Sequence, residues 1–512
     1  MVVYGIDFGT CYSCIALAKE NGDIDILPTR QNNRSLPSVV EFRLRKNGTP
    51  RVGTTAKNAI SPLSRNVAAF LKTEMDHDLS LREYEVLPGQ LRRISPIEFA
   101  ACVYKELYGY ANTQQKNEGN ETSRQAVITV PAACSELQRE KTKLAAEKAG
   151  LQVLKVINEP TAAAISYNTG IGETVMVFDL GGGTHDVSIV QRTSDTDYQV
   201  LASEGDPQLG GKQWDERLVQ IAWQTAGIPF TSETPSHPRL IEFEKHKINL
   251  CSGDDITVTF VDDTGIQHQV DIDRETFEQF TEDLVEKAVN VAREAVRKAR
   301  GNNSSLHIDR ICLAGGSCRM KAIEQALMQA FPQTPVRLTN PDNAIAIGAA
   351  RYALSLVQEG NRYDLRVAER GHAYGLKTIR TDGQYVIENF IRLNDPLEMA
   401  SRVIRNYMPA TSDQWGLTIY ENTDTRDAFP FRNQSSFFRA NLSFERQLTV
   451  GSPLDLSFQR DTNGIVHITI SAGGRQYDFD FATTAGSVSD ATLQQVDELM
   501  QLMQSEYKYF EG

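Results

Sequence analysis

The chain contains 512 residues, with 53 Lys and Arg against 66 Asp and Glu, which gives a formal net charge of −13 at pH 7. Because a single hydrophobic core does not grow to this size, we expect about three domains. The acidic balance disfavours nucleic-acid binding, which uses Lys and Arg against phosphates. No apolar stretch approaches the ~18 residues that a membrane helix needs, so a water-soluble protein is expected.

The first predicted element is a strand, a tight turn and a second strand in "VVYGIDFGTCYSCIAL" (2–17). The acidic residue Asp7 ends the first strand, and Gly9 and Thr10 form the turn. Consecutive backbone N–H groups in such a turn make an anion-binding nest, and the Thr hydroxyl adds a donor. The pattern predicts a phosphate site, with an ordinary hairpin turn as the alternative.

Two cysteines in this segment form a C-x-x-C pattern, which is found in redox pairs and in metal sites. Cys11 and Cys14 lie three positions apart on a predicted strand, so their sulfurs should point to opposite faces. The chain has seven cysteines, an odd number without a second C-x-x-C pattern, which indicates reduced thiols. Apolar alternation begins at Val2 and leaves no room for a signal sequence, so a cytoplasmic location is expected.

Strands and helices alternate along the first 357 residues, which indicates an α/β layered region. Apolar residues at helical spacing predict helices at 96–111, 135–149, 276–300 and 344–358.

A second segment, "VMVFDLGGGTHDVSIV" (175–190), repeats the pattern of the N-terminal one. Asp179 precedes its glycine-rich turn and lies 172 positions after Asp7. The repeat predicts two similar halves that face each other. Two carboxylates beside a polyphosphate would repel it unless a divalent cation lies between them, so the sequence predicts a magnesium–nucleotide site.

Two further segments contain paired glycines. "ICLAGGSCRM" (311–320) again follows a short apolar strand and precedes a helical pattern that runs to Phe331. "GGK" (210–212) is no P-loop, because the required upstream glycine is Asp206 and the residue after the lysine is Gln213.

The alternation of strand and helix patterns ends at about residue 357. Residues 358–372 are polar and punctuated by glycine, which predicts a linker. From 373 to 484 the apolar period is two, and Asn463-Gly464 is a hairpin signal, so an antiparallel β domain is expected. Residues 485–512 contain a predicted helix whose apolar face comprises Leu493, Val496, Leu499, Met500 and Met503.

These motifs resemble, in the same order, those of the seventy-kilodalton heat-shock chaperone family of the DnaK type. "GIDFGTCYSCIA" and "VFDLGGGTHDVSI" are similar to its two phosphate loops, and "INEPTAAAISY" to its connecting segment. "LGGKQWDERL", "EKHKINLC" and "LAGGSCRM" with "NPDNAIAIGAA" resemble its nucleotide-binding segments in the second lobe. The resemblance implies an α/β fold: an actin-like two-lobed ATPase domain at 1–357, which is a duplicated ribonuclease-H-like fold, followed by an antiparallel β-sandwich.

The resemblance also implies the residues of the site. The catalytic residues would be Lys72, Glu159, Asp179 and Thr184. Magnesium and monovalent cations, K⁺ among them, would be held by Asp7, Asp179 and Asp186. ATP or ADP would be bound by Gly9, Thr10, Cys11, Tyr12, Gly181, Gly182, Gly183, Gly210, Gly211, Glu244, Lys247, Ile248, Cys251, Gly315, Gly316, Ser317, Arg319 and Asp342.

Several positions depart from the family pattern. His185 replaces a phenylalanine, and its place on a strand predicts a core histidine that faces away from the nucleotide. Cys11 and Cys318 replace threonines, and Cys251 replaces a serine. We expect all three thiols to border the nucleotide. A redox-sensitive site, in which Lys72 favours a thiolate at Cys11 when the site is empty, is the alternative to passive substitution.

The linker keeps only Leu365 and Val367 of a leucine-rich segment, and most of a helical lid is missing, which leaves a truncated lid in 485–512. The predicted function is a slow ATPase and chaperone that binds extended apolar segments of unfolded protein, with a J-domain co-chaperone and a nucleotide-exchange factor as partners. Three alternatives stay open: a nucleotide-sensing adaptor with one dedicated partner, an actin-like filament protein and a small-molecule kinase.

Overall fold

The chain folds into two compact units, each built from its own sheets. The first comprises Met1–Ala133, Thr142–Arg366 and Gln494–Gly512, and the second comprises Cys134–Lys141 and Val367–Leu493. The computed structural model describes residues 2–42, 48–60, 64–132, 134–194, 197–229, 235–253, 255–262, 264–301, 305–338, 340–358, 366–368, 373–379, 384–392, 401–407, 414–422, 426–431, 438–443, 454–460, 466–472, 474–480 and 488–508.

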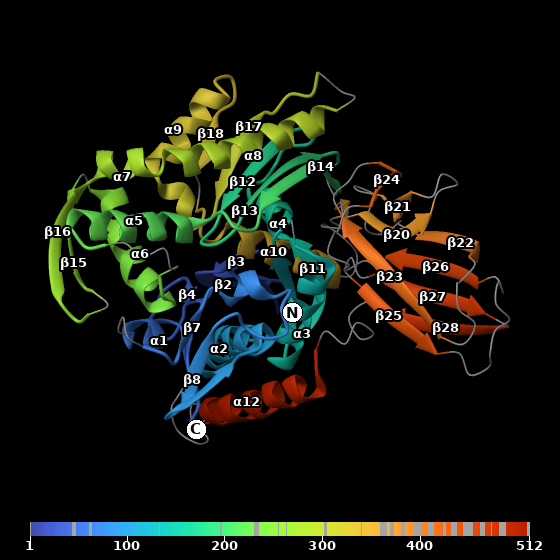
Figure 1. Cartoon of the computed structure of the whole chain (residues 1–512), viewed down its shortest axis with the longest axis horizontal. Coiled ribbons are helices and arrows are strands. Elements are labelled where there is room, and N and C mark those ends of the chain that lie inside the picture. Colours follow the sequence, from blue (N-terminus) through green and yellow to red (C-terminus); the bar gives the residue numbers. More distant parts are fainter. Residues whose placement is uncertain are drawn as a thin grey trace. The chain divides into compact units, whose positions relative to one another are not determined.

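The first unit contains two lobes, and an antiparallel hairpin lies at the centre of each lobe's sheet (Figure 1). The first sheet has the order β11 (Gln152–Asn158), β10 (Gln125–Val130), β1 (Val2–Asp7), β2 (Tyr12–Lys19) and β3 (Ile24–Ile26). The second sheet contains, in order, β18 (Val336–Leu338), β17 (Arg310–Ala314), β12 (Thr174–Leu180), β13 (His185–Arg192) and β14 (Asp197–Asp206).

The two central hairpins share one plan. β1 pairs antiparallel with β2 and parallel with β10, while β12 pairs antiparallel with β13 and parallel with β17. The two aspartates of the sequence repeat occupy matching places, because Asp7 opposes Cys14 and Asp179 opposes Asp186. The repeat predicted from the sequence is confirmed as two equivalent hairpins.

Helices surround these sheets. They are α1 (Thr54–Asn58), α2 (Pro96–Asn117), α3 (Glu136–Lys148), α4 (Glu159–Ser166), α5 (Gly211–Thr225), α6 (His237–Ser252), α7 (Arg274–Phe280), α8 (Glu282–Arg300), α9 (Lys321–Ala330) and α10 (Ala344–Val357), with 3₁₀ turns η1 (Leu71–Glu74) and η2 (Gly316–Arg319). Short strands complete the unit: β4 (Leu36–Pro37), β5 (Val39–Glu41), β6 (Arg51–Val52), β7 (Val67–Ala69), β8 (Glu83–Leu87), β9 (Gln90–Arg93), β15 (Asp255–Val261) and β16 (Gln267–Asp273).

The predicted helix at 276–300 is wrong as one continuous element. It divides at Thr281, whose hydroxyl donates to the carbonyl of Phe277 at 2.9 Å and which starts α8 as its N-terminal cap. Such bonding of a Thr side chain to the preceding turn competes with the helical ladder. The helix predicted at 96–111 instead continues to Asn117.

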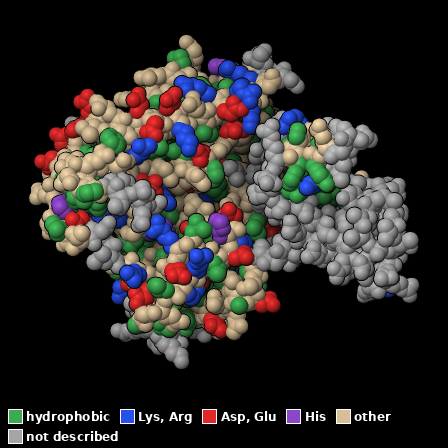
Figure 2. Space-filling model, in the orientation of Figure 1, with side chains coloured by type: hydrophobic (Ala, Val, Ile, Leu, Met, Phe, Trp, Pro, Cys, Tyr) green, Lys and Arg blue, Asp and Glu red, His purple; other side chains and the backbone are tan. Residues whose placement is uncertain are grey.

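The surface of the first unit mixes charges of both signs. On the face in Figure 2, acidic and basic side chains lie interspersed over its described residues. Attraction between such neighbours offsets part of the repulsion that a net charge of −13 produces. Over the described residues, no helix is long and apolar enough to cross a membrane.

The second unit is a sandwich of two antiparallel sheets. One has the order β24 (Ala428–Pro430), β21 (Tyr385–Ile391), β20 (Ala373–Ile379), β23 (Gln414–Asn422) and β25 (Phe438–Ser443). The other has the order β22 (Ser401–Tyr407), β26 (Leu454–Arg460), β27 (Val466–Ala472) and β28 (Arg475–Asp480). The rings of Phe390 and Phe458 stack 3.7 Å apart between the sheets, which confirms the predicted β domain.

Two predicted features of this region lie outside the described residues. They are the Asn463-Gly464 turn and most of the linker at 358–372, of which β19 (Arg366–Ala368) is described.

The C-terminal helix α12 (Asp490–Lys508) belongs, from Gln494 onward, to the first unit. On the predicted apolar face, Val496, Met500 and Met503 are buried. Lys148 of α3 lies 2.7 Å from Asp497, and Lys105 of α2 donates to Gln504. The helix therefore packs beside α2 and α3 (Figure 1).

Candidate functional site

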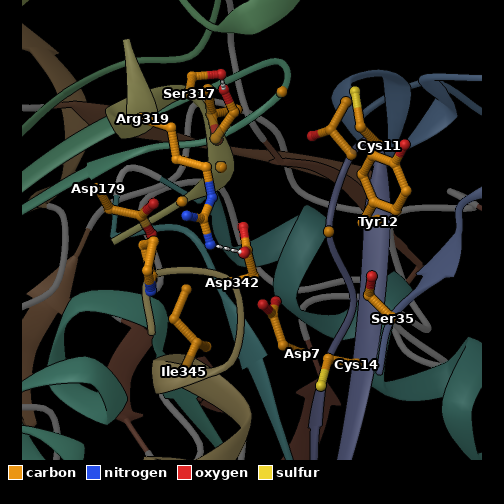
Figure 3. Close-up of a pocket in the computed structure, with 18 of the residues that line it drawn as sticks. Asp7, Cys11, Tyr12, Cys14, Ser35, Asp179, Ser317, Arg319, Asp342 and Ile345 are labelled. Carbon is orange, nitrogen blue, oxygen red and sulfur yellow. Dashed lines mark hydrogen bonds and ion pairs between the residues drawn. The ribbon is translucent and has the colours of Figure 1, made fainter. Parts of the chain in front are cut away.

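A cavity of about 550 Å³ lies between the two lobes of the first unit, where the two central hairpins turn. Figure 3 shows Cys11, Tyr12 and Cys14 on the wall formed by the first hairpin, with Ser317 and Arg319 on the opposite wall. All the predicted site residues line this cavity except Gly183, Gly210, Gly211 and Asp186. The volume falls within the range of small-molecule and cofactor sites.

The two glycine turns touch each other across the cavity floor. A Cβ placed on Gly182 would overlap the sulfur of Cys11, and one on Gly183 would lie 2.6 Å from Cγ2 of Thr10. Only glycines allow this approach, and it leaves backbone N–H groups of both turns free of side-chain bulk. The geometry fits the predicted pair of anion-binding turns.

Side chains behind the first turn hold its shape. Ser13 Oγ accepts a hydrogen bond from Gly9 N at 3.2 Å, and Ser38 Oγ donates to the Gly9 carbonyl at 2.7 Å. The two serine hydroxyls also share a hydrogen bond of 2.8 Å. The turn is therefore fixed before any ligand binds, which lowers the entropic cost of binding.

One lysine meets three carboxylates in the cavity. Lys72 Nζ lies 2.5 Å from Glu159 Oε1, and Asp7 and Asp179 line the same space. Lys72 comes from η1 in the first lobe, and Glu159 begins α4 directly after β11. Burial alone would lower the pKa of Lys72, but the charges of Glu159 and Asp7 outweigh it, so the pKa is raised and the ammonium is retained.

The carboxylates carry more negative charge than Lys72 balances. Burial, followed by repulsion from Glu159, raises the pKa of Asp7 to about 7. Burial and repulsion from Glu159 and Asp186 also raise the pKa of Asp179 well above its usual value. A divalent cation would remove this repulsion, so the charges fit the predicted magnesium ion.

Among the described residues, no three His, Cys, Asp or Glu side chains form a set that could hold a metal ion directly. The magnesium prediction therefore rests on charge and on an ion that keeps its waters. Asp186 is buried opposite Asp179 in the hairpin and does not line the cavity.

Helix α6 presents polar side chains to the cavity. Lys247 Nζ lies 2.8 Å from Asp215 and donates to the Gly211 carbonyl at 2.7 Å. Glu244 forms an ion pair with Lys57, whose ammonium also donates to the Tyr12 hydroxyl at 2.7 Å. Because Lys57 and Tyr12 belong to the first lobe and Glu244 to the second, this network joins the lobes over the cavity.

The third glycine turn forms the remaining wall. Gly315 has φ of +79°, and a Cβ there would overlap the carbonyl oxygen of Leu180, so glycine is required. Ser317 donates to the Gly181 carbonyl at 2.8 Å, which ties this turn to the second glycine turn. Arg319 pairs with Asp342 (Figure 3), and Ile248 is 49% exposed. The side chains of Arg319 and Ile248 leave space for a planar base between them.

The arrangement combines paired glycine turns, a lysine–carboxylate cluster and a partly apolar slot in one interlobe cavity. A model of the Hsp70 protein family matches residues 3–508, nearly the whole chain. The chain belongs to the Hsp70 family. Its first unit is therefore an actin-like two-lobed ATPase, and its second is the family's β-sandwich. Hsp70 proteins are ATP-hydrolysing chaperones that bind ATP or ADP with Mg²⁺, and they generally bind unfolded polypeptides, J-domain proteins and nucleotide-exchange factors.

The cysteines of this Hsp70 protein differ from their predicted placement in one respect. Cys11 and Cys251 line the cavity, but Cys318 is buried in the second-lobe core and donates to the Ala314 carbonyl at 2.9 Å. The prediction that Cys318 borders the nucleotide is wrong, because η2 turns its side chain inward. The sulfurs of Cys11 and Cys14 diverge as predicted, because Cys11 Sγ lies against Gly182 whereas Cys14 Sγ donates to the Arg34 carbonyl and to Asn343 Oδ1, both at 3.3 Å. All seven cysteines lie in described residues, and no disulfide joins them.

The redox expectation for Cys11 also changes. Burial raises the pKa of the Cys11 thiol, and Glu244 raises it further. The cations that oppose this shift are Lys247 and Lys57, not Lys72. The neutral thiol is therefore the stable form, and the expectation that Lys72 favours a thiolate there is wrong.

His185 is a core residue, as predicted. It is fully buried, lies outside the cavity lining, and its ring contacts Phe178 at a centroid distance of 4.4 Å. Its ring nitrogens lie 2.9 Å from the Asp179 carbonyl and 3.0 Å from that of Ala288. Burial lowers its pKa. This histidine therefore links β12 to α8.

Sequence reasoning missed part of the cavity wall. The additional lining residues are Ser13, Cys14, Ser35, Ser252, Met320, Pro341 and Ile345. Ser13 and Cys14 directly follow the first turn, so their position in β2 is a signal that could have found them. Ser35 reaches the cavity from a loop whose placement depends on the tertiary fold.

Proposed function

We propose that this protein is a short DnaK-type chaperone that binds Mg-ATP, hydrolyses it slowly and binds extended apolar segments of unfolded protein. One observation carries the proposal: the cavity between the lobes brings Lys72, Glu159, Asp7 and Asp179 together beside two anion-binding turns. This set holds a polyphosphate and its counter-ion while leaving one carboxylate to act on water.

The roles of the residues follow from their contacts. Bound Mg²⁺ would neutralise phosphate charge, with its waters held by Asp7 and Asp179 and with Asp186 behind them. Lys72 supplies a fixed positive charge at the phosphates, and its ion pair with Glu159 orients that carboxylate as an acceptor for the attacking water's proton. Thr184, which also lines the cavity, orients that water. A K⁺ ion beside the same carboxylates is part of the proposal.

The nucleotide would extend from the two glycine turns toward α6. The Glu244 and Lys247 side chains lie where a ribose follows the phosphates, and Ile248 and Arg319 flank the space for the base. Gly183, Gly210 and Gly211 support the loops from behind, since a Cβ on Gly210 would lie 2.5 Å from Gly183 N.

The β-sandwich is the proposed peptide-binding part. β22 forms an edge of the four-stranded sheet, and its Val403 is 53% exposed. An exposed edge can accept an extended peptide through main-chain hydrogen bonds. A J-domain co-chaperone, a nucleotide-exchange factor and a cytoplasmic location complete the proposal.

The deciding experiment is a steady-state ATPase assay on the full chain, with and without an extended apolar peptide. A Lys72→Ala variant measured in parallel corrects for contaminating ATPases, and a peptide with serines in place of its apolar residues is the matched control. Slow hydrolysis that only the apolar peptide stimulates supports the proposal. Hydrolysis that neither peptide changes would contradict coupled chaperone action and favour an adaptor with one partner.

A further inference from the structure

A buried apolar cluster closes the cavity by joining the two lobes. Helix α6 is anchored in the second-lobe core through Phe243 and Leu250. One turn earlier, Leu240 and Ile241 leave that core and pack against the first lobe. Their partners there are Val39, Ala56, Val67, Ala69 and Phe70. Any opening of the cavity on this side must separate these side chains.

His237, the first residue of α6, lies at the edge of this cluster and is 4% exposed. Its ring meets the ring of Phe70 edge-on, with centroids 5.2 Å apart. Its Nδ1 lies 3.3 Å from the hydroxyl of Tyr84. Nearby, Arg82 donates to the Pro235 carbonyl at 3.2 Å. A second-lobe histidine is thus enclosed by first-lobe side chains.

The Phe70 contact leads directly to Lys72. Phe70 has φ of +62°, a conformation that non-glycine residues adopt only when their surroundings hold them in it. It is the N-terminal cap of η1, and its carbonyl accepts hydrogen bonds from N and Oγ1 of Thr73. The Phe70 ring meets the ring of His237 and lies in the same buried cluster as Ile241.

The charges around His237 disfavour its protonation. Arg82 precedes β8, and Lys212 of α5 lies 5.7 Å from the Phe70 ring centroid. Burial first, and then these two cations, lowers the pKa of His237 well below its usual value. The other titratable groups of the surrounding elements are Tyr84 on β8, Glu74 on η1 beside it, Glu216 on α5 near both cations, and the Arg239–Glu242 pair on α6.

We propose that His237 is a positioning residue and a proton-sensitive latch. As a neutral imidazole it holds α6 closed over the nucleotide and keeps Phe70, and therefore Lys72, in place; once protonated in the open cleft, it prevents closure. The inference rests on the proposed nucleotide site, because it assigns a function to the interface that covers that site.

The sign of the pH effect follows from linkage. His237 takes up a proton more readily in the open cleft, where its pKa returns to about 6.5, than in the closed one. Closure is therefore fully favourable above pH 6.5 and weakens as the pH falls below it. With an open-state pKa of about 6.5, the open fraction increases about tenfold from pH 7.5 to pH 5.5.

The test measures dissociation of a fluorescent ADP from the full chain between pH 7.5 and 5.5. His237→Asn keeps an acceptor for Tyr84 but cannot titrate, and His246→Asn, on the same helix, is the matched control. We expect ADP release from the wild type and from His246→Asn to accelerate about tenfold over this range. Release from His237→Asn should change much less. Asp7 and Asp215, whose pKa values are raised to about 7, titrate in all three proteins, so the difference between variants isolates His237.

Two results would overturn the latch: a pH dependence in His237→Asn equal to that of the wild type, or release from the wild type that does not change with pH. If His237→Asn does not fold, Tyr84→Phe replaces it. This variant removes the hydrogen bond to Nδ1 and should accelerate release at pH 7.5 several-fold, and an unchanged rate there would also overturn the latch. Failure to bind ADP at any pH would instead contradict the proposed function.

Discussion

Lys72 Nζ lies 2.5 Å from Glu159 Oε1, and both side chains are less than a tenth exposed. A 3₁₀ turn of the first lobe supplies the ammonium, and the N-terminus of α4 supplies the carboxylate. Asp7 and Asp179 face the same space, so the Lys72 ammonium is the counter-charge for these carboxylates. Without it, the carboxylates would repel one another and a bound polyphosphate. Hydrolysis should therefore depend on this contact more than nucleotide binding does.

Replacing Lys72 with alanine should lower the single-turnover rate of ATP hydrolysis by about 10²–10³-fold, the usual effect of removing one transition-state donor. Binding of ADP should weaken far less, because the glycine turns keep their backbone donors. Rapid-quench measurement of the rate and calorimetric titration with ADP separate the two effects. Lys19→Ala, at an exposed ion pair with Asp25, is the control and should behave as the wild type. Equal loss of binding and hydrolysis would show that Lys72 only shapes the site.

In the nucleotide-free protein, the contribution of Asp7 to thermal stability should fall as the pH rises from 5 to 8. Burial and Glu159 raise the pKa of Asp7 to about 7, so the folded state binds a proton that the unfolded state releases near pH 4. The stability that this bound proton contributes is fully present below pH 4 and is lost as the pH rises through 7. Differential scanning calorimetry should therefore show that the melting temperature of the wild type falls relative to that of Asp7→Asn as the pH rises from 5 to 8. Added Mg²⁺ should stabilise the wild type more at pH 8 than at pH 5.5; the same gain in Asp7→Asn would contradict a role for this carboxylate.

How far the sequence predicts this structure depends on how local each feature is. The turns at Gly9 and Gly181 are specified by neighbouring residues, so their conformation and the pairing of the two hairpins could be predicted. Cys318 could not be placed, because the direction of its side chain depends on how η2 packs on the second-lobe core. The contact of His237 with Phe70 joins residues 167 positions apart in different lobes, and no local pattern encodes it.

The C-terminal helix is a second example of a non-local feature. The sequence predicts its apolar face, but its packing position beside α2 and α3 depends on residues that are distant in the sequence. Val496→Asp should detach it, because a buried, unpaired carboxylate costs several kcal/mol. Hydrogen exchange of amides in residues 494–508 should then accelerate by about tenfold or more. Gln495→Asp places the same charge on the exposed side and should leave exchange unchanged. The exposed Lys148–Asp497 pair contributes about 1 kcal/mol or less, so Asp497→Asn should have little effect.

Cys11 stands in the first glycine turn, with its sulfur against Gly182 of the second. A thiol is a weak donor, whereas a hydroxyl bonded to a charged phosphate contributes roughly 1–3 kcal/mol. Cys11→Thr should therefore tighten ATP binding by about tenfold, as measured by calorimetry. Cys134→Ser, outside the cavity, is the matched control. Unchanged affinity in Cys11→Thr would show that the backbone N–H groups alone bind the phosphates.

The reactivity of Cys11 reports whether its thiol is protonated. Because burial and Glu244 raise its pKa, Cys11 is protonated near neutral pH, and only a thiolate reacts rapidly with alkylating reagents. Mass spectrometry after a short treatment with iodoacetamide at pH 7.5 should find Cys11 unmodified both with and without ATP. Rapid alkylation that ATP prevents would contradict the raised pKa and restore the redox-sensitive interpretation, since it would require a thiolate in the empty site.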